Sequence, residues 1–120
     1  MEIQKIDHIQ LAIPAGGEAL AREFYGNLLG LTEVKKPENL QGRGGVWFAN
    51  GGVKIHLGVD KQFTPARKAH PAFQVKNLGE LRGQIEKTQY TIVDDEPLSG
   101  YDRFYVNDPF GNRIEFLEPT

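Results

Sequence analysis

Hydrophobic and polar residues alternate along this chain in short runs, a pattern typical of half-buried β-strands. In residues 8–13, Ile9, Leu11 and Ile13 share one face, while His8, Gln10 and Ala12 share the other. The same alternation predicts further strands at residues 31–36, 45–49, 53–59, 70–75, 90–93, 103–106 and 113–117. The intervening Asn-Gly at 50–51 predicts a tight hairpin, and Asp-Pro-Phe-Gly at 108–111 predicts a turn.

Two segments have helical periodicity instead. Residues 18–29 carry an apolar residue at every fourth position, and Gly30 stands where a glycine ends a helix. Residues 77–88 predict a second helix, with Asn77 as its N-cap and Glu80 at the reciprocal capping position. The buried stripe of this second helix would be Leu78, Leu81 and Ile85. Residues 37–45 contain no such pattern and are predicted to form a loop.

The elements occur in the order strand–helix–strand–strand–strand, and this order is found twice. The halves separate near residue 65, which predicts one α+β domain made of two modules, at about residues 1–62 and 66–120. His8 and His70 begin the first strand of each module, and His56 and Glu115 lie in the middle of each last strand. This correspondence indicates an internal duplication.

Composition limits the function classes. The 120 residues carry a net charge of −2, so electrostatics give no support to a nucleic-acid partner. Without cysteine, the chain has no disulfide, thiolate metal site or cysteine nucleophile. The N-terminus leads directly into a strand pattern with no signal-peptide features, and no apolar run is long enough to span a membrane. A cytoplasmic location is the default expectation.

Strand periodicity places four potential metal ligands on the sheet faces that point away from the helices. These residues are His8, His56, His70 and Glu115, and they include every histidine of the chain. If the two sheets curl together, the four side chains can converge and bind a divalent ion such as Zn, Ni, Fe or Mn. In the alternative interpretation, each histidine is hydrogen-bonded or solvated, and Glu115 lies on a wet sheet face. The residues alone leave both interpretations open.

The segments DHIQLAI, FYGNLLGL, AHPAFQV and DPFGNRIEF resemble the vicinal oxygen chelate superfamily. This family includes glyoxalase I, fosfomycin-resistance thiol transferases, methylmalonyl-CoA epimerase, extradiol dioxygenases and bleomycin-binding proteins. The resemblance implies paired βαβββ modules whose mixed sheets form a U-shaped, partly closed cup with helices outside. It also implies a homodimer, because cups of this family are often shared between subunits.

By motif, His8, His70 and Glu115 match metal ligands of the family, and His56 matches the position of a fourth ligand. Glyoxalase I usually has glutamate or glutamine at that fourth position, so His56 is a departure. In a glyoxalase-like reaction, proton transfer would fall to Glu115 released from the metal or to a metal-bound hydroxide, whereas in a dioxygenase His56 would stay off the metal and act as the acid–base group. A further departure is Ala12, which replaces an arginine that helps glyoxalase I to hold glutathione.

Four more residues share the faces that carry the ligands. Trp47 could stack on a planar part of a substrate, and Arg103 could bind a carboxylate or phosphate. Tyr105 could donate a hydrogen bond to an enolate, and Gln10 could orient the substrate. Each could equally be a rim or surface residue.

The resulting hypothesis is a glyoxalase-like lyase or isomerase that binds vicinal oxygens of a small substrate and stabilises an enediolate. Two alternatives are an Fe(II) extradiol-type dioxygenase, with His56 off the metal, and a non-enzymatic drug-binding protein.

Overall fold

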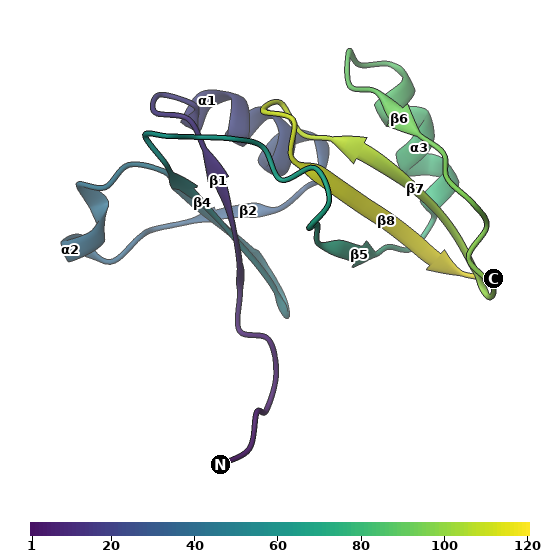
Figure 1. Cartoon of the computed structure of the whole chain (residues 1–120), viewed down its shortest axis with the longest axis horizontal. Coiled ribbons are helices and arrows are strands. Elements are labelled where there is room, and N and C mark those ends of the chain that lie inside the picture. The colour runs from purple at the N-terminus through teal and green to yellow at the C-terminus, as the bar shows by residue number, and fades with distance from the viewer. The chain divides into compact units, whose positions relative to one another are not determined.

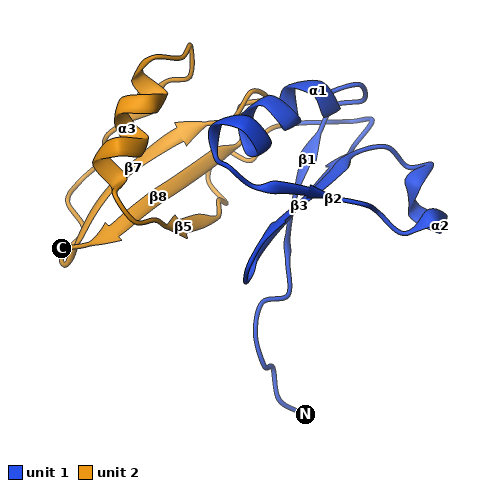
Figure 2. Cartoon of the chain, turned by 180° about the vertical axis from the view of Figure 1, so that it is seen from behind, with its two compact units in different colours: residues 1–64 blue, residues 65–120 orange.

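The computed structural model describes all of residues 1–120, and the chain divides into two compact units. Unit 1 comprises Met1–Thr64 and unit 2 comprises Pro65–Thr120 (Figure 2). Each unit contains a four-stranded mixed sheet and a helical segment between its first two strands. The predicted α+β class is therefore confirmed. None of the helices is long and apolar enough to cross a membrane.

Unit 1 contains one mixed sheet with strand order β1-β4-β3-β2 (Figure 1). Strand β1 runs parallel to β4, and the other neighbours are antiparallel. Its elements in chain order are β1 (Ile9–Ile13), α1 (Glu18–Ala21), η1 (Arg22–Leu28), β2 (Thr32–Val34), α2 (Glu38–Gln41), β3 (Val46–Asn50) and β4 (Val53–Val59). The predicted Asn-Gly hairpin joins β3 to β4.

The first helix differs from a regular α-helix. After the single turn of α1, the chain widens into the π-helix η1, in which the N–H of Leu29 donates to the carbonyl of Phe24, five residues earlier, at 3.0 Å. The buried side of the segment is formed by Ala21, Phe24 and Tyr25, whereas Leu20, which the period of four placed with Phe24, is 47% exposed. Gly30 ends the segment with φ +74, as predicted.

The loop prediction for residues 37–45 was incomplete, because they include the short helix α2. The carbonyl of Pro37 accepts a hydrogen bond from the N–H of Leu40 at 2.9 Å, which closes the first turn. Four residues with one leucine are too few for a helical period to show in the sequence. The segment after α2 is held by Lys36 Nζ, which donates to the carbonyl of Gly44.

Unit 2 repeats the arrangement with strand order β5-β8-β7-β6. Strand β5 runs parallel to β8, and the remaining pairs are antiparallel. The elements are β5 (Ala72–Gln74), α3 (Leu78–Glu86), β6 (Ile92–Val93), β7 (Tyr101–Asn107) and β8 (Arg113–Pro119). The predicted turn before β8 is confirmed, since Asp108 Oδ1 accepts from the N–H groups of Phe110 and Asn112, both at 2.9 Å.

The start of α3 is capped from a distant part of the chain. The predicted cap Asn77 is wrong, because its side chain makes no capping hydrogen bond and its backbone is left-handed, with φ 64. Instead, the carboxylate of Glu118 in β8 accepts from the N–H of Asn77 at 2.8 Å and of Leu78 at 3.0 Å. These two backbone hydrogen bonds lower the pKa of Glu118.

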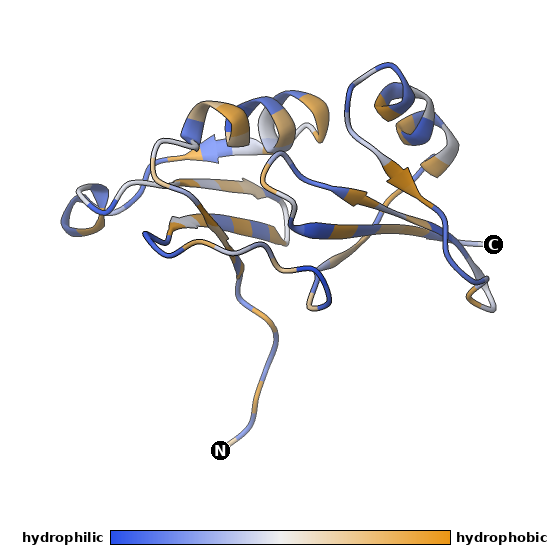
Figure 3. Ribbon diagram, turned by 45° about the horizontal axis from the view of Figure 1, so that its top comes forward, coloured by the Kyte–Doolittle hydropathy of each residue, from blue (hydrophilic) through white to orange (hydrophobic).

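Each sheet has one apolar face, which is buried under the helical segment of its unit. Figure 3 shows the alternation as bands of apolar and polar colour along the strands. In unit 1, Tyr25 of η1 lies against Phe48, with ring centroids 6.1 Å apart. In unit 2, the guanidinium of Arg82 on α3 lies 5.5 Å from the ring centroid of Phe104. The opposite face of each sheet is left for polar side chains, as the strand periodicity predicts.

We expect Gly45→Ala to destabilise the protein by more than about 2 kcal/mol. Gly45 has φ +83, and a Cβ there would lie 2.2 Å from the carbonyl oxygen of Leu57. Gly42→Ala is the matched control, since Gly42 has φ −68 and no atom lies within 4 Å of an added Cβ. Urea unfolding measures both, and equal midpoints for the two variants would contradict the strain at Gly45.

Candidate functional site

The polar face of the unit 1 sheet brings predicted site residues into one row. The strand register pairs Gln10 of β1 with His56 of β4, and His56 with Trp47 of β3. Paired residues on neighbouring strands have Cβ atoms roughly 5 Å apart, so these three side chains are direct neighbours.

Three rings lie one over another on this face. The indole of Trp47 stacks on the imidazole of His56 with centroids 3.7 Å apart and planes 2° apart. His8, which precedes β1, stacks on His56 at 4.2 Å and 21°. His56 is only 9% exposed, whereas the side chain of His8 is 43% exposed and its Nδ1 lies 3.0 Å from Asp7 Oδ2. We call Trp47, His56 and His8 the ring stack.

The ring stack favours neutral His56. Burial is the main cause that lowers the pKa of His56, and charge repulsion from His8 adds to it. Asp7 opposes the shift more weakly. A neutral imidazole has a free nitrogen lone pair, which is the form that binds a metal or accepts a proton.

In unit 2, Glu115 of β8 is the buried centre of a second polar cluster. It is 6% exposed, and its Oε1 lies 2.8 Å from His70 Nε2. The other ring nitrogen of His70, Nδ1, lies 2.8 Å from the carbonyl oxygen of Lys68. Both ring nitrogens therefore face oxygen atoms, so either His70 carries two protons or Glu115 carries one.

Arg103 and Tyr105 of β7 complete this cluster. Arg103 Nη1 donates to Tyr105 Oη at 2.8 Å and lies 3.5 Å from Glu115 Oε2, while Nη2 donates to the carbonyl of Glu96 at 2.8 Å. Burial opposes the charge of Arg103, but Tyr105 and Glu115 outweigh it and raise the pKa of the guanidinium. Its Nε is buried without a hydrogen-bond partner. We call Glu115, His70, Arg103 and Tyr105 the Glu115 network.

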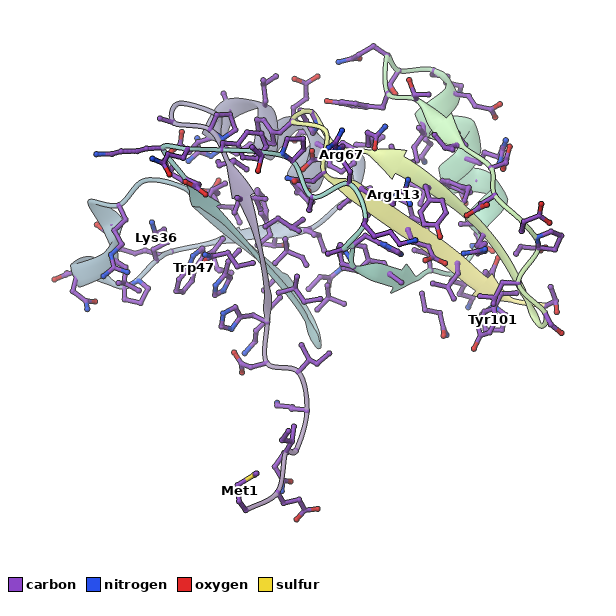
Figure 4. The ribbon with its side chains drawn as sticks, viewed as in Figure 1. Met1, Lys36, Trp47, Arg67, Tyr101 and Arg113 are labelled. Atoms are coloured by element: carbon purple, nitrogen blue, oxygen red, sulfur yellow. The ribbon has the colours of Figure 1, made fainter.

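Tyr105 is also held by two ring contacts. The ring of His70 meets it edge-on, with centroids 5.2 Å apart and planes 88° apart. Arg113, which is labelled in Figure 4, lies with its guanidinium carbon 4.8 Å from the centroid of the tyrosine ring. These contacts fix the phenol, so its hydroxyl keeps one position beside Arg103.

Each unit thus assembles two of the four predicted metal ligands. His8 and His56 lie together in unit 1, and His70 and Glu115 lie together in unit 2. Neither unit contains a group of three or more His, Cys, Asp or Glu side chains that could hold a metal ion. The convergence of all four on one ion stays a prediction.

A pocket beside the ring stack was missed from the sequence. It has a volume of about 220 Å³, and Gln10 and Trp47 contribute to its lining, together with Lys36, Leu40, Arg43, Gly44, Leu57, Gly58 and Val59. Figure 4 labels Lys36 and Trp47, two of its residues. The sequence does contain the two cations of this pocket, Lys36 and Arg43, on either side of the segment 37–42. Nothing in the sequence, however, indicated that they lie against β1 and β4.

Comparisons with known proteins agree with this architecture. The family model described as Glyoxalase/Bleomycin resistance protein/Dioxygenase superfamily matches residues 5–116. A solved structure of a glyoxalase family protein from Bacillus anthracis is 48% identical, with a TM-score of 0.95 over 100% of this chain and 98% of that chain. "Glyoxylase I 4" from Arabidopsis thaliana is 24% identical over 126 residues, which cover 96% of this chain and 71% of that protein. A fosfomycin resistance protein from Listeria monocytogenes shares the fold, with 18% identity and a TM-score of 0.73 over 99% of this chain and 94% of that chain.

The lowered pKa of His56 predicts a loss of stability in mild acid. Between the folded pKa and the ordinary value of about 6.5, the unfolded chain binds more protons at this position, so stability falls as pH falls through that window. The slope of the free energy of unfolding against pH reports the protons taken up on unfolding. We expect His56→Gln to reduce this uptake by a fraction of one proton between pH 7.5 and 5.5. Urea unfolding at several pH values measures this, and parallel curves for variant and wild type would refute it.

Proposed function

Because the chain belongs to the Glyoxalase/Bleomycin resistance protein/Dioxygenase superfamily, we propose that it is a metal-dependent enzyme of the lyase or isomerase type. Its substrate is a small molecule with oxygens on two adjacent carbons. The observation that carries this proposal is Glu115, a buried acid held between an imidazole and a guanidinium on the polar face of a sheet. Buried carboxyl groups with such partners are common at sites of proton transfer.

The proposed ligands are His8, His56, His70 and Glu115, and their chemistry fits a divalent ion such as Zn, Ni, Fe or Mn. The neutral form of His56 is favoured, and the carbonyl of Lys68 at Nδ1 orients His70 so that Nε2 is its ligating atom. When bound, the ion would polarise the two substrate oxygens and stabilise negative charge on them.

The remaining roles follow from the chain's own contacts. Glu115, when released from the ion, would accept a proton from the carbon next to the substrate carbonyl, and Arg103, 3.5 Å from Oε2, keeps the carboxylate in place. Tyr105 donates its hydroxyl hydrogen to the oxygen on which charge develops. His56 is a ligand in this scheme and would act as an acid–base group only if it stays off the ion, and Trp47 stacks on the planar part of the substrate.

One observation favours a second candidate function. The ring stack is an aromatic platform of the kind that binds flat drugs, and it forms within unit 1 alone. A non-enzymatic drug-binding protein would bind its ligand equally well after removal of metal, whereas an Fe(II) dioxygenase would consume oxygen.

The family resemblance also favours a homodimer, which light scattering of the purified protein tests.

Added metal should stabilise the native protein. With free metal at one hundred times Kd, binding to the native state alone adds about 2.7 kcal/mol, which is seen as a higher melting temperature. We expect His8→Ala, His56→Ala, His70→Ala and Glu115→Gln each to lose most of this increase. Glu118→Gln is the control, since it makes the same change on the opposite face of β8 and should keep the full increase from its own baseline. A uniform response in all five variants would exclude this ligand set.

Proton abstraction can be followed separately from binding. With hydroxyacetone in deuterium oxide, the metal-loaded protein should speed the entry of deuterium next to the carbonyl, as measured by proton NMR. Glu115→Gln should reduce this rate by about 100-fold or more, because the general base is lost, whereas Glu118→Gln should retain it. Exchange at the background rate with wild type, or unchanged exchange in Glu115→Gln, would count against the role of Glu115.

A further inference from the structure

We propose that the pocket beside the ring stack binds an acidic group, so that the substrate is a carboxylate or phosphate whose planar part reaches Trp47. This inference rests on the proposed function, because the ligand would be the substrate of that site. The pocket of about 220 Å³ is smaller than the roughly 300–1,000 Å³ typical of sites for whole drug-sized ligands. It therefore takes one end of a substrate.

Gly58 forms part of the lining of this pocket, and Gly45 lies beside it. An added Cβ on Gly58 would lie 2.8 Å from Gln10 Nε2, so the amide of Gln10 lies directly over the backbone of β4. An added Cβ on Gly45 would lie 3.4 Å from the Cα of Gly58, which shows that the two glycines are neighbours. A larger side chain at Gly58 would therefore displace the amide of Gln10, which lines the pocket with Trp47.

Positive charge borders the pocket. Lys36 and Arg43 are the charged residues of its lining, and no acidic residue is among them. Lys36 Nζ donates one hydrogen to the carbonyl of Gly44, which leaves two hydrogens for a ligand. The guanidinium of Arg43 has neither a hydrogen bond nor an ion pair.

One acid, Glu18, lies near these cations. Its Oε2 accepts a hydrogen bond from the N–H of Gly45 at 2.8 Å, which fixes the carboxylate behind the glycine segment. This bond is the main cause that lowers the pKa of Glu18, and attraction to Lys36 is among the further causes, whereas attraction to Arg43 is not. Glu18 therefore supports the wall and offsets part of the charge of Lys36, and Arg43 is the main cation left to bind an anion.

The other polar and aromatic groups set the kind of ligand. The amide of Gln10 adds two N–H donors, and the indole of Trp47 gives a flat apolar wall. Donors and cations at one end with an aromatic wall at the other fit an aryl acid better than an aliphatic amine or a neutral sugar. The inferred substrate class is a planar acid with vicinal oxygens.

Trp47 is the single tryptophan of the chain, so its fluorescence reports on this pocket. The test titrates the full chain, freed of metal with EDTA, with benzoate, phenyl phosphate and the neutral isostere benzamide. We expect saturable quenching by benzoate or phenyl phosphate with an affinity about tenfold higher than that of benzamide, and this preference should fall with added salt. The stronger of the two acids identifies the group that the pocket prefers.

Variants of the lining residues test whether the cations cause the preference for acids. Arg43→Gln and Lys36→Gln should each reduce the preference for the acid, and Gly58→Val should abolish binding of acid and amide alike. Lys61→Gln is the control, because Lys61 is an exposed cation of unit 1 outside the lining, and it should behave as wild type. Since Lys36 also supports the segment after α2, melting curves establish that its variant is folded, and Arg43→Gln provides an independent test.

Equal affinity for benzoate, phenyl phosphate and benzamide, or an undiminished preference in Arg43→Gln, would overturn the proposal. The measurement uses protein without metal, so it is separate from the metal-binding and deuterium-exchange tests. A missing preference for acids would not change the outcome of the metal-binding and deuterium-exchange tests. Failure of those two tests would likewise not change the outcome of this titration.

Discussion

A β-strand turns successive side chains to opposite faces, and each sheet of this protein has helical cover on only one of them. Burial of Phe48 and Ile55 under η1 therefore forces their chain neighbours Trp47 and His56 to the uncovered face. In unit 2 the same constraint buries Phe116 beneath α3 and turns Glu115 away from it. The packing of the apolar core thus selects which polar residues meet, and the strand register selects their partners.

The two polar clusters differ in how they offset the cost of burying an ionisable side chain. The ring stack covers His56 with two flat neighbours, which favours the uncharged imidazole. The Glu115 network keeps an acid beside a guanidinium and an imidazole, so that attraction and hydrogen bonds offset the loss of water. One cluster therefore presents a neutral imidazole, and the other presents a buried carboxyl group in contact with an imidazole and a guanidinium.

Local signals in the sequence predicted the parts of this fold that local forces determine. The Asn-Gly hairpin, the turn at Asp108 and the strand positions of His56 and Glu115 follow from residues within a few positions of one another. The prediction that His8 and His70 begin strands was wrong, because β1 starts at Ile9 and β5 at Ala72. The cap of α3 could not be found in this way, because the helix start is capped by Glu118, 41 residues after Asn77 in the chain. Strand periodicity gave the face of His56 but neither its stacking on Trp47 nor the neighbouring pocket, since both depend on which strands pair and in which register.

Strand β8 carries two acids three residues apart, and their odd separation places them on opposite sides of one sheet. Glu118 holds the start of a helix on one side, and Glu115 belongs to the polar cluster on the other. A slip of this strand by a single residue would therefore uncap the helix and turn Glu115 into the apolar core at the same time. A single register of β8 therefore serves both the helix cap and the polar cluster, so the same strand pairing secures both.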